Sequence, residues 1–227
     1  MRTIASIGGG ELGKLETLGI DAEIVKRTGK KTPRALFIPT ASHDSPGYCE
    51  TFRTVYGERL GCEVNCLLLA NNGTSAGEIE RQIAQADLIY VGGGDTAYLL
   101  EIWRKRMVRP HLWNAYESGT ILAGISAGSI CWFEYGLGDE SELIEGLGFL
   151  KGYHSPHFNE KRAEEAFISI LRGTNGQGIG IDDHCAVIFQ GEEYEAISMR
   201  AGANAYRVVD RDGRIVKTKL ASSSVYV

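Results

Sequence analysis

The chain lacks two features that would place it in other protein classes. None of its apolar runs approaches the roughly 18 to 20 residues that a membrane-crossing helix needs, so no membrane-spanning segment is predicted. Acidic residues outnumber basic ones by 29 to 24, which gives a net charge of -5. The basic stripe that is typical of a nucleic-acid surface is therefore missing. We expect neither a membrane nor a nucleic acid as a partner.

Cysteine is also sparse and unpatterned. Cys62 and Cys66 lie in a strand-like run without the spacing of a metal site. The apolar part of the N-terminal segment is too short for a signal peptide. We therefore expect reduced cysteines that serve packing, no metal ion and a cytoplasmic location. The five cysteines are Cys49, Cys62, Cys66, Cys131 and Cys185.

Continuous apolar runs alternate with helical patterns over the first 125 residues. This alternation predicts βαβ units, and therefore an α/β fold with a mostly parallel sheet between two helical layers. The predicted strands cover 3–7, 34–40, 62–69, 88–91 and 121–125. The predicted helices cover 11–27, 48–60, 78–86, 96–105 and 110–117, with Asp95 or Thr96 as the cap of the fourth.

The pattern changes after residue 149. An extended segment at 152–158 leads to a predicted helix at 160–171, with Asn159 as its cap. Four β-like runs follow near 178–181, 186–189, 195–199 and 205–209, and Asp212-Gly213 predicts a turn before a strand at 214–219. We expect one domain over 1–227 with a more antiparallel C-terminal part.

The strand predicted at 121–125 ends in Gly124-Ile125-Ser126-Ala127-Gly128. This is the G-x-S-x-G arrangement, in which a strand turns sharply into a helix and holds a serine at the bend. Small flanking residues let the strand and the helix pass closely, and free N–H groups at the helix start can stabilise an oxyanion. Ser126 is the predicted nucleophile.

Two glycine clusters follow predicted strands, at 8–13 and 92–97, and both fit variants of the dinucleotide-binding motif. That site also needs a ribose-binding carboxylate, but the second strand ends in Pro39-Thr40-Ala41. We therefore expect no cofactor, and interpret the first cluster as a tight turn with close backbone approach. An oxyanion hole needs two amide donors, and Gly94 and Ala127 are the predicted pair.

A serine nucleophile needs a base. His154 and His157 share the extended segment at 152–158. The strand-end position favours His157, with His154 packed or lining the site. His43 lies in a loop that could face the site, and His111 lies on a predicted helix.

The acid that would orient the histidine has two candidate positions. Asp182 and Asp183 follow the strand-like run at 178–181, whereas Asp139, Glu140 and Glu142 lie closer to the serine. Either cluster could fix the imidazole tautomer and stabilise the imidazolium. The residues alone leave this choice open.

Four motifs in series resemble the peptidase E and cyanophycinase family of serine peptidases. They are Val91-Gly-Gly-Gly-Asp-Thr96, Gly124-Ile-Ser-Ala-Gly128, Ser155-Pro-His-Phe158 and Gly180-Ile-Asp-Asp183. The resemblance implies a fold similar to class I glutamine amidotransferases. The opening Ile7-Gly-Gly-Gly10 resembles the cyanophycinase-like branch.

The resemblance implies Ser126 as nucleophile, His157 as general base, and Gly94 with Ala127 as oxyanion hole. The family usually carries glutamate at the position of Asp183. The shorter aspartate could still orient His157, so Asp183 is the expected acid and Asp139 the alternative. The family's members cleave after an N-terminal aspartate or at β-aspartyl-arginine links. We therefore expect an acyl-enzyme mechanism on small aspartyl peptides, by a monomer or a homodimer.

Two other functions fit parts of the sequence. An α/β-hydrolase esterase has the order Ser, acid, His, which Ser126, Asp139 and His157 would satisfy. Its histidine, however, normally lies near the end of the chain. A non-catalytic nucleotide- or metabolite-binding module would use the glycine loops instead. A glutamine amidotransferase is disfavoured, because its nucleophile is cysteine.

Overall fold

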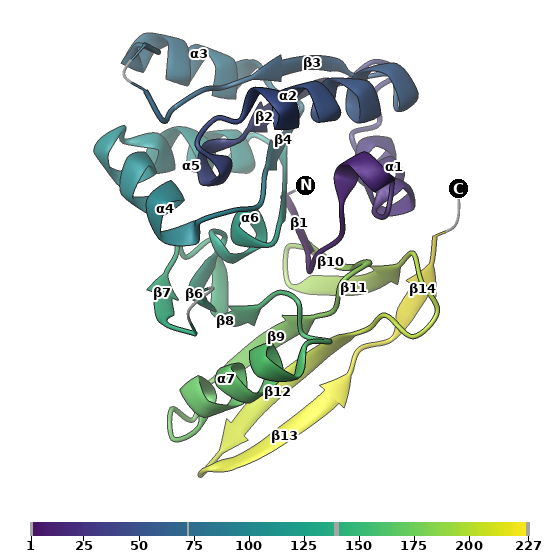
Figure 1. The fold of residues 1–227 in the computed structure, drawn as a ribbon, viewed down its shortest axis with the longest axis vertical. Coiled ribbons are helices and arrows are strands. Elements are labelled where there is room, and N and C mark those ends of the chain that lie inside the picture. Colours follow the sequence, from purple (N-terminus) through teal and green to yellow (C-terminus); the bar gives the residue numbers. More distant parts are fainter. Residues whose placement is uncertain (1, 72, 139–140, 226–227) are drawn as a thin grey trace.

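The computed structural model describes residues 2–71, 73–138 and 141–225, which fold around two β-sheets (Figure 1). The larger sheet has the order β14-β11-β10-β1-β5-β4-β2-β3. The strands from β1 to β3 in this order are parallel, and β10 pairs antiparallel with both β1 and β11. The bounds are β1 Thr3–Ile7, β2 Arg34–Ile38, β3 Glu63–Cys66, β4 Leu88–Val91, β5 Ile121–Ile125, β10 Cys185–Gln190, β11 Glu193–Ser198 and β14 Ser222–Ser224.

Helices cover both faces of the parallel strands. Successive side chains of a strand point to opposite sides of the sheet, so each strand contributes to a core on each face. Ile4 of β1 packs in the core that α3, α4 and α5 cover, and its neighbour Ala5 packs in the core that α1 and α2 cover. The predicted fold class, with helical layers around a mostly parallel sheet, is confirmed. The helices are α1 Leu18–Arg27, α2 Pro46–Phe52, α3 Ala76–Gln85, α4 Thr96–Lys105, α5 Val108–Glu117, α6 Ala127–Ile130 and α7 Lys161–Leu171.

The second sheet has the order β13-β12-β9-β8-β6-β7 and is mixed. Helix α7 packs on it through Phe167 and Leu171, which meet Phe158 and Val208. The hairpin of β12 and β13 turns at Asp212-Gly213, both with positive φ, as the sequence predicts. The bounds are β6 Phe133–Leu137, β7 Leu143–Glu145, β8 Leu150–Ser155, β9 Gln177–Ile181, β12 Ala205–Arg211 and β13 Arg214–Lys219.

Two predicted helices differ from the structure. The segment 11–27 divides into a short 3-10 turn, η1 (Leu12–Lys14), and α1, because Leu15 adopts φ 62° and ends the first piece. The segment 48–60 begins earlier, where Ser45 caps α2, and continues as the wider helix η3 (Arg53–Arg59). Among the described residues, the helices include none with both the length and the apolar character needed to cross a membrane.

Candidate active site

The predicted site residues follow the carboxyl ends of strands from both sheets. Ser126 follows β5 and Gly94 follows β4, whereas His157 follows β8 and Asp183 follows β9. A bridge from Gly9, after β1, to Asp183 joins the two groups. Side chains that are far apart in sequence therefore converge where the two sheets meet, at the strand ends where α/β folds place their ligands.

The turn at Ser126 is strained. Its φ of 53° and ψ of -117° are rare for a residue other than glycine. The Ser126 amide donates to the carbonyl of Ile7 at 3.1 Å, which fixes the bend against β1. A side chain at Gly124 would overlap the carbonyl of Gly128, and one at Gly128 would overlap that of Val91. The glycines of the G-x-S-x-G motif therefore permit the tight crossing of strand and helix.

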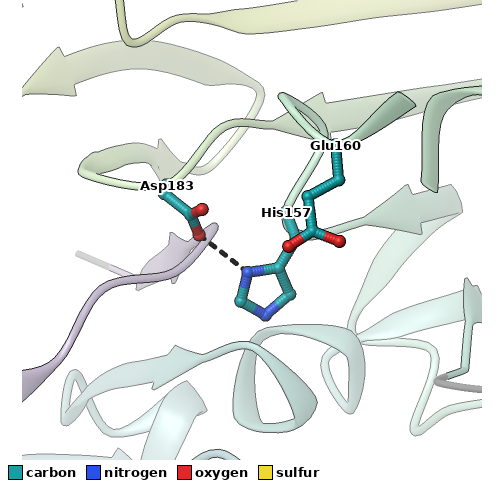
Figure 2. Close-up of side chains that lie close together, drawn as sticks. All are labelled: His157, Glu160 and Asp183. Atoms are coloured by element: carbon teal, nitrogen blue, oxygen red, sulfur yellow. Dashed lines mark hydrogen bonds and ion pairs between the residues drawn. The ribbon is translucent and has the colours of Figure 1, made fainter. Parts of the chain in front are cut away.

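Ser126, His157 and Asp183 form a hydrogen-bonded row. The Ser126 hydroxyl donates to Nε2 of His157 at 2.9 Å, and Nδ1 of His157 donates to Oδ1 of Asp183 at 2.7 Å. The hydrogen bond from His157 lowers the pKa of the Asp183 carboxyl, so this group stays ionised and accepts. That assigns the ring proton to Nδ1 and leaves the Nε2 lone pair facing the serine. Figure 2 shows the contact between the ring and the carboxylate.

Asn159 holds the acid from its other side. Its amide donates to Oδ2 of Asp183 at 3.1 Å, and its side-chain oxygen accepts from the Asp183 backbone N–H at 2.7 Å. The prediction that Asn159 caps α7 is wrong, because the cap position belongs to Glu160 and carries no side-chain hydrogen bond. The capping signal concealed this role, because asparagine suits both positions.

The first glycine cluster supports the histidine and the acid. A side chain at Gly9 would lie 2.5 Å from Nδ1 of His157 and closer still to Oδ1 of Asp183. The His157 amide donates to the carbonyl of Gly8 at 3.2 Å. The space beside Gly9 is therefore occupied by the His157–Asp183 pair, which bears out the predicted close backbone approach.

The second glycine cluster lies against the serine. A side chain at Gly93 would meet Cβ of Ser126 at 3.4 Å. Gly94 has φ 133°, and a side chain there would lie 3.0 Å from the Ser42 amide and closer to the carbonyl of Ala41. Asp95 caps α4 by accepting from the Tyr98 amide at 2.9 Å. Ala127 is the first residue of α6, and such amides have no acceptor within their helix.

The other histidines lie outside the hydrogen-bonded row. His154 is buried; its Nδ1 donates to the carbonyl of Ile179 at 2.9 Å, and its Nε2 accepts from Ser129 at 2.8 Å. Burial lowers the pKa of His154 to about 4, so the ring is neutral and packed. His43 is exposed and packs against Tyr98, with ring centroids 4.1 Å apart and ring planes tilted by 46°.

Of the alternative acids, the structure describes Asp182 but not Asp139 or Glu140. Asp182 accepts from the Asn204 amide through Oδ2 at 2.9 Å, so this atom serves the loop before β12, and burial raises the pKa of Asp182. Asp139 and Glu140 lie outside the described residues. Asp183 is thus the acid candidate whose carboxylate accepts a hydrogen bond from His157. The chain order Ser126, His157, Asp183 differs from the order of an α/β-hydrolase esterase.

A third ionisable side chain stands beside the row. Glu160 is exposed, and its carboxylate lies next to the His157 ring (Figure 2). One carboxylate oxygen of Glu160, a ring nitrogen of His157 and a carboxylate oxygen of Asp183 lie within 4.8 Å of one another. The sequence assigned Glu160 only to the start of a helix. Its spacing of three residues from His157, across a turn, is the signal that could have found it.

Known proteins that resemble this chain in sequence and fold are named as peptidases. The pattern of peptidase family S51 matches residues 4–197. The uncharacterised peptidase YgaJ of Bacillus subtilis (strain 168) is 34% identical, over 97% of each chain. The crystal structure of a peptidase from an acI-B1 Actinobacterium has a TM-score of 0.74 at 22% identity, with 96% of this chain and 94% of that chain covered. A candidate peptidase E of Listeria monocytogenes EGD-e has a TM-score of 0.67 at 21% identity, with 88% and 100% covered.

These matches define a serine-type peptidase, a hydrolase, on a mixed α/β fold. The chain belongs to peptidase family S51.

Proposed function

We propose that this peptidase cleaves small aspartyl peptides through a Ser126–His157–Asp183 triad and an acyl-enzyme. The observation that carries the proposal is the row of hydrogen bonds, 2.9 Å from serine to imidazole and 2.7 Å from imidazole to carboxylate. A nucleophile, a base and an orienting acid at these distances are what serine-based acyl transfer requires.

In the first half-reaction, Oγ of Ser126 attacks the scissile carbonyl carbon while Nε2 of His157 takes the hydroxyl proton. The amides of Gly94 and Ala127 donate to the resulting oxyanion. Collapse breaks the C–N bond, and His157 returns the proton to the leaving amine. Water then attacks the ester with His157 again as base, which releases the acid and restores Ser126.

The substrate class is supported by the charges beside the base. A hollow of about 110 Å³ next to His157 is lined by Glu160 and Arg162, among others. An N-terminal aspartate carries an ammonium and a side-chain carboxylate, so one group of each sign complements it. The small volume suits a peptide end rather than a long chain. The remaining lining residues are Leu137, Gly138, Ser141, Pro156 and Ala163.

The proposal is tested by hydrolysis of a dipeptide panel that contains Asp-Xaa, β-aspartyl, Glu-Xaa and Ala-Xaa members. The wild type should prefer an aspartyl member, and Ser126→Ala should abolish turnover. Ser118→Ala is the matched control, because Ser118 is an exposed serine at the end of α5 and precedes β5, whereas Ser126 follows the other end of that strand. Turnover that survives in Ser126→Ala would remove Ser126 as nucleophile. A preference for the alanyl member would reject the substrate class.

A further inference from the structure

The side chains of His157, Glu160 and Asp183 form a set of metal-ligand atoms within 4.8 Å of one another. The turn between β8 and α7 brings the first two together, because the Glu160 amide donates to the carbonyl of His157 at 2.9 Å. Figure 2 shows the Glu160 carboxylate beside the His157 ring. The set is imidazole with two carboxylates, a combination that suits zinc.

Both carboxylates have lone pairs that can bind a metal ion. An ionised carboxylate offers about four lone-pair positions, and Asp183 uses one oxygen for His157 and the other for Asn159. Glu160 is exposed, and none of the described residues donates a hydrogen bond to its side chain or forms an ion pair with it. Moving the Glu160 carboxylate toward a metal ion therefore breaks no contact with the described part of the chain.

The geometry points to an inhibitory site for a divalent cation of the zinc class, formed by His157, Glu160 and Asp183. Zinc–ligand distances of about 2 Å in a tetrahedron place ligand atoms about 3.3 Å apart. The present separations of up to 4.8 Å therefore close with a shift of about 1.5 Å, which the exposed Glu160 side chain can provide. Three protein ligands leave the fourth position for water. The proposed site differs from the expectation drawn from the sequence, which was that the protein binds no metal ion.

The inhibition follows from which ring nitrogen of His157 carries the proton, and it rests on the proposed function. Metal bound at Nδ1 takes the lone pair that a proton now occupies, so the single proton of the neutral ring moves to Nε2. Nε2 then faces Ser126 as a donor and cannot accept the hydroxyl proton. The metal ion also lies between His157 and Asp183, where their 2.7 Å hydrogen bond is replaced. Turnover stops while the fold is unchanged.

Titration of zinc chloride into the Ser126→Ala variant, followed by calorimetry, tests the site without relying on turnover. This background keeps all three ligands. We expect it to bind one Zn²⁺ at this site, and Glu160→Gln in the same background to weaken that binding at least tenfold. Glu165→Gln is the matched control, because Glu165 is exposed on the same helix and its removal costs the same charge. Any zinc that the cysteine thiols bind is the same in both variants, so it does not affect the comparison.

Equal zinc affinity in the Glu160→Gln and Glu165→Gln variants, or no binding in the parent, would overturn the site. In the wild type, Zn²⁺ should stop hydrolysis of the preferred dipeptide, and EDTA should restore it. Binding without inhibition would overturn the inhibitory role. If zinc binds as expected but the wild type hydrolyses none of the dipeptides, the proposed function fails and the metal site stands.

Discussion

Gly9 separates two interpretations of the first glycine cluster. In the dinucleotide motif Gly9 is a variable position and Gly13 is required. In the structure the reverse holds, because a methyl group at Gly9 would lie 2.5 Å from Nδ1 of His157, whereas one at Gly13 meets only Thr51, at 3.5 Å. Ordinary contact begins near 3.4 Å. The Gly9→Ala variant therefore displaces the ring or the acid by about 1 Å.

A displacement of this size has a large effect on catalysis. Misplacing a catalytic group by 1 Å costs about 10²-fold, and losing the orienting acid of a triad costs about 10⁴-fold. We expect the kcat of Gly9→Ala for the preferred dipeptide to fall by 10²- to 10⁴-fold. Overpacking should also lower the free energy of unfolding by about 1 to 3 kcal/mol.

The assay compares steady-state hydrolysis and thermal unfolding of the wild type, Gly9→Ala and Gly13→Ala. Gly13→Ala is the matched control and should keep its kcat within about twofold, since the added methyl group makes only an ordinary contact. A folded Gly9→Ala enzyme with wild-type kcat would refute the packing argument. Loss of activity in Gly13→Ala alone would favour a motif that binds phosphate.

Three further predictions concern other parts of the molecule. Burial raises the pKa of Asp21 to about 7, so the folded state keeps a proton that the unfolded state loses near pH 4. The free energy of unfolding should therefore fall by about 3 kcal/mol between pH 4 and 7, and denaturant titrations of Asp21→Asn should lack this decline. Arg162→Leu should raise KM for Asp-Xaa peptides about tenfold and leave that for Ala-Xaa unchanged; equal effects would refute charge recognition. Asn159→Ala should lower kcat about tenfold, and an unchanged kcat would reject its positioning role.

The central sheet could be predicted from the sequence because its signal is local. Strands buried on both faces are continuous apolar runs, and β1, β4 and β5 have the bounds that these runs predict. Strands β6, β7 and β14 were missed. β6 begins three residues after the four-residue helix α6, and β7 has only three residues. Such short elements depend on pairing partners that are distant in sequence.

The site was predictable where one residue carries its own motif and less so where the fold supplies the neighbour. The bend at Ser126 follows from glycines two residues away on each side. Asn159 and Glu160 look like helix-start residues, and their proximity to Asp183 arises only when β8 and β9 pair. Gly9 meets Asp183 across 174 residues of sequence, so its role could not be predicted from the local pattern.

The most direct test of the central claim is the reaction of the wild-type protein with a fluorophosphonate, followed by peptide mapping. We expect one adduct, on Ser126, and no adduct in His157→Ala, because the base that activates the hydroxyl is gone. An adduct on another serine, or equal labelling of Ser126 with and without His157, would contradict the claim.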